Sequence, residues 1–107
     1  MVARIQVPAT ARAGEAIEVR LTIQHPMETG FRFELGGRPI PKNVINSLRV
    51  RYNGATIFRA EMGSGIAANP YLQFHAVARK SGEIEVAWVD DNGDRGVETA
   101  AITVTGA

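Results

Sequence analysis

The chain has 107 residues, with 12 basic and 11 acidic side chains and no cysteine. This length supports one hydrophobic core, so we expect a single domain over residues 1–107 that needs neither disulfides nor a structural metal. The net charge of +1 argues against nonspecific binding to nucleic acid or anionic lipid, and the absence of cysteine excludes thiolate chemistry and covalent sulfur attachment to this chain.

Apolar and polar residues alternate along most of the chain, with the period of two that is typical of half-buried strands. The pattern is clearest at residues 16–25, and Pro26 should end that strand because it cannot donate to a sheet. Further alternating runs lie at residues 2–7, 71–76, 83–88 and 99–104, and a short candidate strand lies at residues 31–35. Because residues 2–7 alternate, we expect no signal peptide in this chain.

The Asn-Gly pair at residues 53–54 predicts a hairpin. A two-residue turn would place Leu48 opposite Arg59, whereas a three-residue loop at residues 52–54 places Leu48 opposite Phe58. The second register keeps the apolar side chains of both strands on one face. We therefore predict the three-residue loop, with its glycine in the left-handed conformation and forming a bulge.

About seven strands separated by turn signals, with no helical spacing, predict an all-β fold, an immunoglobulin-like antiparallel β-sandwich. We predict no enzyme, because no nucleophile, base and orienting group are recognisable together. Asp90, Asn92 and Asp94 have the spacing of a calcium loop, but Arg95 and Ala101 replace its required glycine and glutamate. A polar hairpin turn is the better interpretation, and we expect no cofactor.

A copper site is the alternative function that the residues leave open. His25 and Met27 offer imidazole and thioether ligands, which are suited to copper, and His75 and Met62 would complete a site if the fold brought them near. The competing interpretation is a strand that ends at Pro26 and is followed by a packed methionine.

One predicted surface points to a protein partner. The outward residues selected on the last two strands form a face poor in charge, which favours contact with another protein. They are Ala87, Val89, Val97, Thr99 and Ala101. We add His25, Met27 and Glu28 as predicted partner-contact residues. The alternatives are that the inside–outside assignment is displaced by one residue, or that a loop covers this face.

Three sequence blocks occur in an order that resembles the SoxZ family of the Sox sulfur-oxidation system. They are HPMETG at residues 25–30, ANPYLQF at residues 68–74 and WVDDNG at residues 88–93. The resemblance covers essentially the whole chain. Residues 31–37 depart from it, because they are more apolar than the charged loop typical of the family.

The resemblance implies an immunoglobulin-like, non-catalytic subunit of the SoxYZ carrier complex in thiosulfate oxidation. Its partner would be a SoxY subunit, whose glycine-rich C-terminal arm bears the cysteine that carries the sulfur intermediate. Other Sox enzymes would be met transiently, and self-association is expected when SoxY is absent. The resemblance also implies a periplasmic location, reached by export with a signal-bearing partner.

Overall fold

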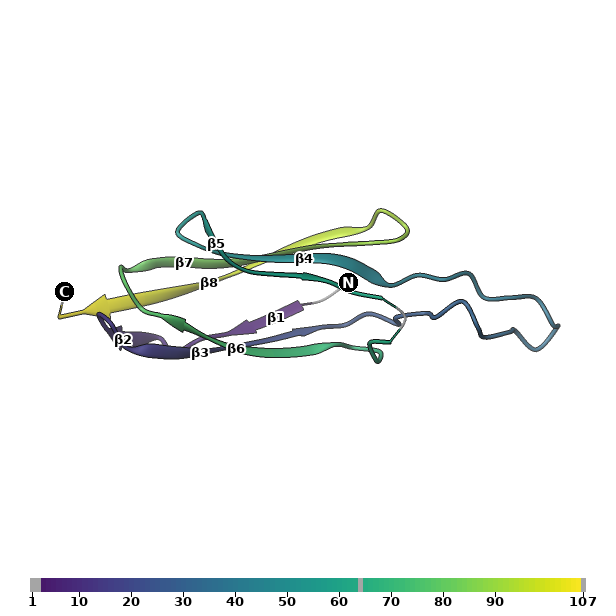
Figure 1. The fold of residues 1–107 in the computed structure, drawn as a ribbon, viewed down its shortest axis with the longest axis horizontal. Coiled ribbons are helices and arrows are strands. Elements are labelled where there is room, and N and C mark those ends of the chain that lie inside the picture. The colour runs from purple at the N-terminus through teal and green to yellow at the C-terminus, as the bar shows by residue number, and fades with distance from the viewer. Residues whose placement is uncertain (1–2, 64, 107) are drawn as a thin grey trace.

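The computed structural model describes residues 3–63 and 65–106, which form two sheets packed face to face (Figure 1). The strands are β1 (Ala3–Gln6), β2 (Thr10–Arg12), β3 (Ala16–Ile23), β4 (Ile45–Tyr52), β5 (Ala55–Glu61), β6 (Tyr71–Val77), β7 (Gly82–Asp90) and β8 (Arg95–Thr105). One sheet has the order β1-β3-β6 and the other the order β2-β8-β7-β4-β5. This arrangement confirms the predicted all-β sandwich. The described part of the chain holds no helix that is long and apolar enough to cross a lipid bilayer.

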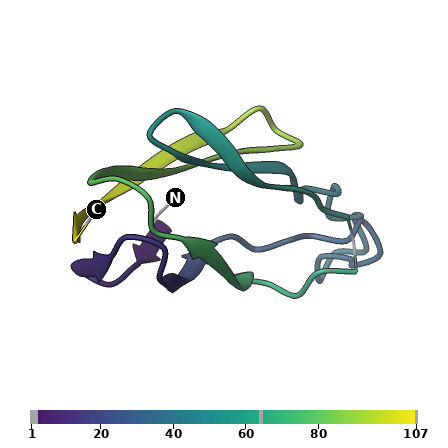
Figure 2. The same ribbon diagram turned by 60° about the vertical axis from the view of Figure 1, so that its left-hand side comes forward.

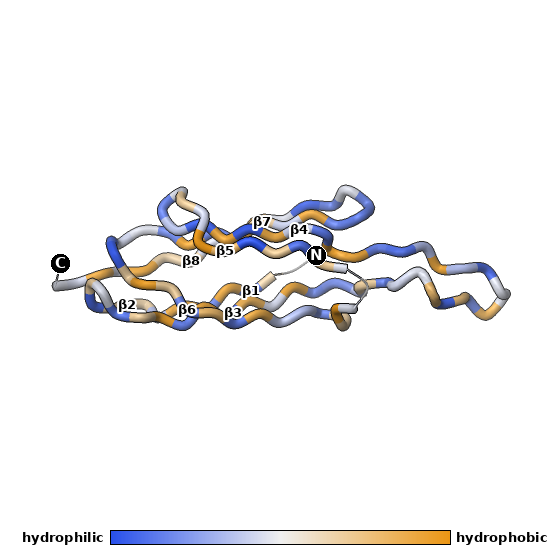
Figure 3. Tube along the Cα trace, in the orientation of Figure 1, coloured by the Kyte–Doolittle hydropathy of each residue, from blue (hydrophilic) through white to orange (hydrophobic). Residues whose placement is uncertain are grey.

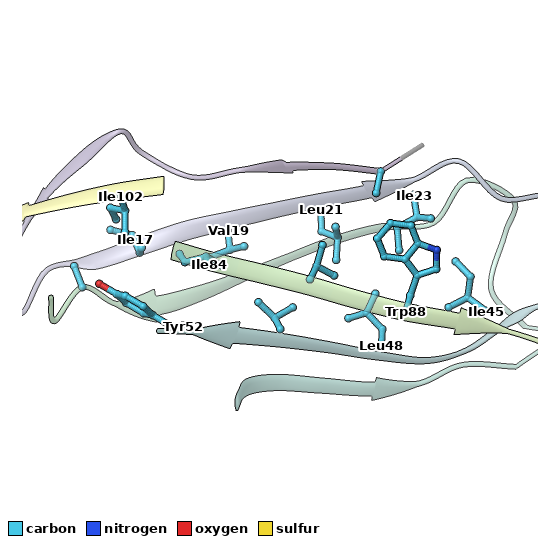
Figure 4. Packing of buried hydrophobic residues seen from close by; sticks show 14 of the residues in the cluster. Ile17, Val19, Leu21, Ile23, Ile45, Leu48, Tyr52, Ile84, Trp88 and Ile102 are labelled. Carbon is cyan, nitrogen blue, oxygen red and sulfur yellow. The ribbon is translucent and has the colours of Figure 1, made fainter. Parts of the chain in front are cut away.

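The core lies between the two sheets and is built from the apolar half of each alternating strand (Figure 4). On β3, Val19 and Leu21 are completely buried, whereas Arg20 between them is exposed. They face residues of β4 and β7 such as Val50 and Val86, which are also completely buried. The period of two in the sequence therefore assigned the faces of these strands correctly.

The β4–β5 hairpin differs from the prediction at its turn. Tyr52 pairs with Ala55, so the turn has two residues, and both Asn53 and Gly54 have positive φ, 48° and 85°. These angles are those of a type I′ turn. The three-residue loop predicted at residues 52–54 is therefore wrong.

A bulge in β5 preserves the apolar face of this hairpin in spite of the shorter turn. The register shifts after Val50, which leaves Ile57 as the extra residue and pairs Val50 with Phe58. Two residues of β5 then lie opposite one residue of β4. This shift of one position turns the apolar side chains of β5 beyond the bulge back toward the core. Leu48 consequently lies opposite Ala60, and the predicted set of inward side chains is correct although its pairing is not.

Residues 28–43 form a narrow two-stranded projection, which we name the finger, in place of the strand predicted at residues 31–35. Glu28 and Asn43 exchange two main-chain hydrogen bonds of 2.8 and 2.9 Å, and the Ile40 N–H donates to the Arg32 carbonyl at 2.9 Å. Figures 1 and 2 show the finger extending beyond the end of the sandwich. It makes the molecule 61 Å long but only 19 Å wide.

Strand β2 was not predicted. Its three residues, Thr10–Arg12, pair in parallel with residues Thr103–Thr105 of β8. A segment this short has too few residues to show a period of two, so only its neighbour in space identifies it as a strand.

We expect Gly96→Ala to destabilise the fold, because this glycine lies directly against the indole of Trp88. A Cβ at this position would lie 2.0 Å from Cζ2 of Trp88, a ring that is only 5% exposed. Overpacking of this kind costs about 1–3 kcal/mol. Urea denaturation should show that loss, whereas the control Gly36→Ala, with no atom within 4 Å of the new Cβ, should change the unfolding free energy little. Equal stability of the two variants would contradict this packing.

Candidate functional site

The three sequence blocks meet at the end of the sandwich from which the finger projects. We name their meeting point the junction; it comprises His25, Met27, Asn69, Asp90 and Asp91. His25 follows β3 of the three-stranded sheet and Asp90 ends β7 of the five-stranded sheet. Both side chains are 1% exposed, and His25 Nε2 lies 3.0 Å from Oδ2 of Asp90. The junction therefore connects the two layers through a buried polar contact.

The hydrogen bonds around the imidazole determine which of its nitrogens carries the proton. The main-chain N–H of Met27 donates to Nδ1 of His25 at 2.9 Å, so Nδ1 is an acceptor. The proton then resides on Nε2, which donates it to Asp90. Both ring nitrogens are thus occupied by protein hydrogen bonds.

Asn69 and Asp91 fix the main chain on both sides of this pair. The Asn69 side-chain oxygen accepts from the His25 N–H at 3.0 Å, and the Asn69 N–H donates to the His25 carbonyl at 2.8 Å. Asp91 accepts from the Asn46 side chain at 3.1 Å and from the Val44 N–H at 3.2 Å. The hydrogen bonds from Asn46 and Val44 lower the pKa of Asp91, so the stability they contribute is present at neutral pH and is lost as the pH falls through that lowered value.

The junction does not suit copper. Met27 is 3% exposed, and its Sδ accepts from the Ile45 N–H at 3.3 Å. His25 has no free ring nitrogen, and His75 lies on the solvent side of β6, where its ring is 4.0 Å from Glu18. The histidine and methionine ligands proposed from the sequence are therefore not presented together. Within residues 3–63 and 65–106 no group of three or more His, Cys, Asp or Glu side chains is placed to hold a metal ion.

The acidic residues at positions 90–94 form a turn, as the sequence favoured. Oδ1 of Asp90 accepts from the main-chain N–H groups of Asn92 and Asp94 at 3.0 and 2.9 Å. This carboxylate therefore stabilises the β7–β8 connection from within, and its other oxygen is bound to His25.

The predicted partner-contact residues divide into buried and exposed groups. His25 and Met27 lie in the interior, where they cannot reach a partner's surface, because they complete the junction. Glu28 is half-buried at the base of the finger, and its Oε1 accepts from Arg32 at 2.6 Å. The sequence analysis counted both among the contact residues because a polar imidazole after a strand gives no sign of a buried acceptor 65 positions away.

The other predicted contact residues do lie on the outer face of β7 and β8. Val97 is 60% exposed, Thr99 and Ala101 are exposed, and Ala87 and Val89 are half-buried. The inside–outside assignment of these strands is therefore correct. Their contact with a partner stays a prediction.

The finger presents apolar side chains that the sequence analysis did not select. Phe31, Phe33 and Leu35 are 81, 67 and 111% exposed. Figure 3 shows hydrophobic residues along the finger among hydrophilic ones. A two-stranded projection has no core of its own in which to bury such side chains, so they indicate a contact surface for another molecule. The apolar composition of residues 31–37 was the available signal.

The outer face of the five-stranded sheet also holds a groove that the sequence analysis missed. Its volume is about 490 Å³, and arginines from β4, β5 and β8 line it. They are Arg49, Arg51, Arg59 and Arg95. Alternation shows that Arg49 and Arg51 share a face, but only strand pairing reveals that Arg59 lies directly opposite Arg49.

Comparison with known proteins identifies one family. A family model described as sulphur oxidation protein SoxZ matches residues 5–101. No curated protein matches the chain.

Solved structures of other proteins share the fold at low sequence identity. A superoxide reductase (neelaredoxin) from Ignicoccus hospitalis has a TM-score of 0.76 at 18% identity, over 98% of this chain and 81% of that one. The sulfur carrier protein SoxY from Chlorobium limicola f thiosulfatophilum has a TM-score of 0.66 at 11% identity, over 97% and 79%. A superoxide reductase from Archaeoglobus fulgidus has a TM-score of 0.64 at 19% identity, over 95% and 89%. Identities this low show the fold alone.

We expect Asp90→Ala to destabilise the protein by about 3 kcal/mol, because it leaves the buried His25 N–H without an acceptor. The matched control is Asp94→Ala in the same turn, where the exposed side chain should contribute less than about 0.5 kcal/mol. Chemical denaturation of both variants measures the difference. If Asp90→Ala lowers the free energy of unfolding as little as Asp94→Ala does, the junction does not hold the two sheets together.

Proposed function

Because this chain belongs to the SoxZ family, and so to the sulfur-oxidation system, we propose that it is the non-catalytic subunit of a SoxYZ carrier complex in thiosulfate oxidation. The family match over residues 5–101 carries this proposal. Its partner is a SoxY-type subunit, whose C-terminal arm carries the sulfur intermediate covalently on a cysteine.

The chemistry of the chain supports a non-catalytic role beside a partner that carries the sulfur. None of its 107 residues is cysteine, so it has no thiolate to bind sulfur covalently or to remove sulfur from a partner by thiol–disulfide exchange. A subunit without thiols can therefore lie beside a cysteine-bound intermediate without reacting with it. The superoxide reductases among the structural neighbours share only the fold, and fold alone does not assign an activity.

Two exposed surfaces are available for the SoxY-type subunit and for the enzymes that the carrier meets. The finger offers Phe33 and its exposed neighbours, and the outer face of β7 and β8 offers Val97 opposite Ala87. Large apolar side chains at the centre of an interface contribute most of its binding energy. We assign the standing contact with the SoxY-type subunit to the finger, because its apolar side chains are the more exposed, and self-association to the same surface when that subunit is absent.

We further propose a periplasmic location for this chain. The carrier acts in the periplasm, and this chain reaches that compartment together with a signal-bearing SoxY-type partner. Fractionation of cells that express both chains tests this: the chain should be periplasmic when the partner has its signal peptide and should stay in the cytoplasm when that peptide is deleted. Periplasmic protein without the partner would contradict joint export.

We expect a SoxY-type subunit to co-purify with this chain when the two are co-expressed. Phe33→Ser should weaken the complex at least about tenfold, since truncation of a central aromatic anchor costs this much or more. The matched control is Tyr71→Ser on β6 of the three-stranded sheet. It removes another exposed aromatic ring, 54% exposed, and should change the affinity less than about twofold. Calorimetry of the separated subunits measures both.

These experiments distinguish whether the complex forms from which surface of this chain makes the contact. Absence of any wild-type complex would overturn the proposed function. A complex that Phe33→Ser leaves intact but Val97→Lys abolishes would move the contact from the finger to the β7–β8 face.

A further inference from the structure

The groove on the five-stranded sheet carries an excess of positive charge that the fold does not neutralise. Four arginines line it against one acidic side chain, Glu61. Of these four arginines only Arg51 has an ionic partner within the described part of the chain, Glu85 at 3.9 Å, whereas Arg49, Arg59 and Arg95 have none there within 4.0 Å. Three unpaired guanidinium groups on one sheet face, two on the adjacent strands β4 and β5 and one on β8 beyond β7, are therefore free to bind an anion.

The position of two of these arginines is unfavourable for the sheet itself. Arg49 on β4 and Arg59 on β5 are directly opposite each other, and both line the groove. Like charges in opposite positions on neighbouring strands destabilise a sheet. Arg49 is also half-buried, which limits the access of water to its charge. An anion bound between the two side chains would remove this repulsion.

We propose that this groove binds a sulfur oxyanion, and that its ligand is the sulfonate end of the sulfur group carried by the partner subunit. The second half of this inference rests on the proposed function, in which thiosulfate-derived sulfur is bound to the partner's cysteine. Binding is noncovalent: the guanidinium groups donate hydrogen bonds to the sulfonate oxygens, and no bond to sulfur is made or broken.

The groove has the size and lining that such a group requires. Its volume of about 490 Å³ lies within the range of about 300–1,000 Å³ that is typical of small-molecule sites. A sulfonate has three acceptor oxygens, and the adjacent strands β4 and β5 offer it two opposed guanidinium donors, Arg49 and Arg59. Ala87 and Val97 provide an apolar floor beside the charges, which suits the sulfur and methylene groups that precede the sulfonate.

The location of the groove also suits a carrier. It shares Ala87, Val89 and Val97 with the outer face of β7 and β8 and continues from there across β4 and β5. It lies on the sandwich and not on the finger, so it shares no residue with the surface assigned to the standing partner contact. A flexible arm of that partner can then reach it.

Titration of the full chain with sodium thiosulfate, followed by NMR of the arginine side-chain signals, tests the oxyanion site. We expect saturable shifts at Arg49, Arg59 and Arg95 that sodium chloride at the same ionic strength does not reproduce. Arg49→Gln and Arg59→Gln should each weaken binding at least about tenfold. The matched control is Arg4→Gln on β1 of the other sheet, which should bind as the wild type does.

The same variants distinguish a binding site from a structural role. Because Arg49 and Arg59 repel each other, Arg59→Gln should leave the melting temperature unchanged or raise it. A fall in melting temperature, or shifts that sodium chloride reproduces, would overturn the oxyanion site.

Three peptides identify the source of the ligand. They are a glycine-rich peptide whose one cysteine carries a thiosulfonate, the same peptide with a free thiol, and the same peptide with aspartate in place of the cysteine. Binding of the thiosulfonate peptide alone supports a partner-borne ligand. Binding of thiosulfate but of none of the peptides overturns that source, and equal binding of the aspartate peptide overturns the preference for sulfonate and indicates a carboxylate-binding protein contact.

The failure of this inference can be told apart from failure of the proposed function. Suppose that the SoxY-type subunit co-purifies with the wild type and with Arg49→Gln, but neither thiosulfate nor the thiosulfonate peptide binds. This result would support the proposed complex and contradict the oxyanion site in the groove.

Discussion

The buried hydrogen bond between His25 and Asp90 is the contact on which the rest of the structure depends. It joins the end of β3 to the end of β7 and so connects the two sheets at the end of the sandwich that bears the finger. A polar pair in the interior is stable only when its other atoms are also hydrogen-bonded, and here Met27, Asn92 and Asp94 supply those bonds. The junction thus defines where the sandwich ends and where the finger begins.

This contact explains why the sequence blocks that resemble the SoxZ family lie far apart in the chain. His25 comes from the first block, Asn69 from the second and Asp90 from the third, and all three meet in one hydrogen-bonded network. The blocks therefore specify the architecture of this end of the sandwich. The surfaces available to other molecules lie elsewhere, on the finger and on the outer face of the five-stranded sheet.

In the proposed carrier role the chain has to bind its partner and tolerate the cargo, and we assign these tasks to two different surfaces. The finger exposes apolar rings such as Phe33, which suit a lasting contact. The groove exposes unpaired arginines such as Arg49, which suit a charged group that arrives and leaves. The two surfaces have no residue in common.

The sequence by itself determined the longer strands, their inward and outward faces and the sandwich, because a period of two along one strand is a local property. It also indicated the family, because the order of the three sequence blocks can be read from the sequence alone. Only the tertiary structure decided that His25 and Met27 are buried, that a bulge at Ile57 compensates for a two-residue turn, and that Arg59 faces Arg49. The reason is physical: each of these facts depends on which residue lies opposite across a sheet or between sheets, and periodicity assigns a residue to a face without naming its neighbour.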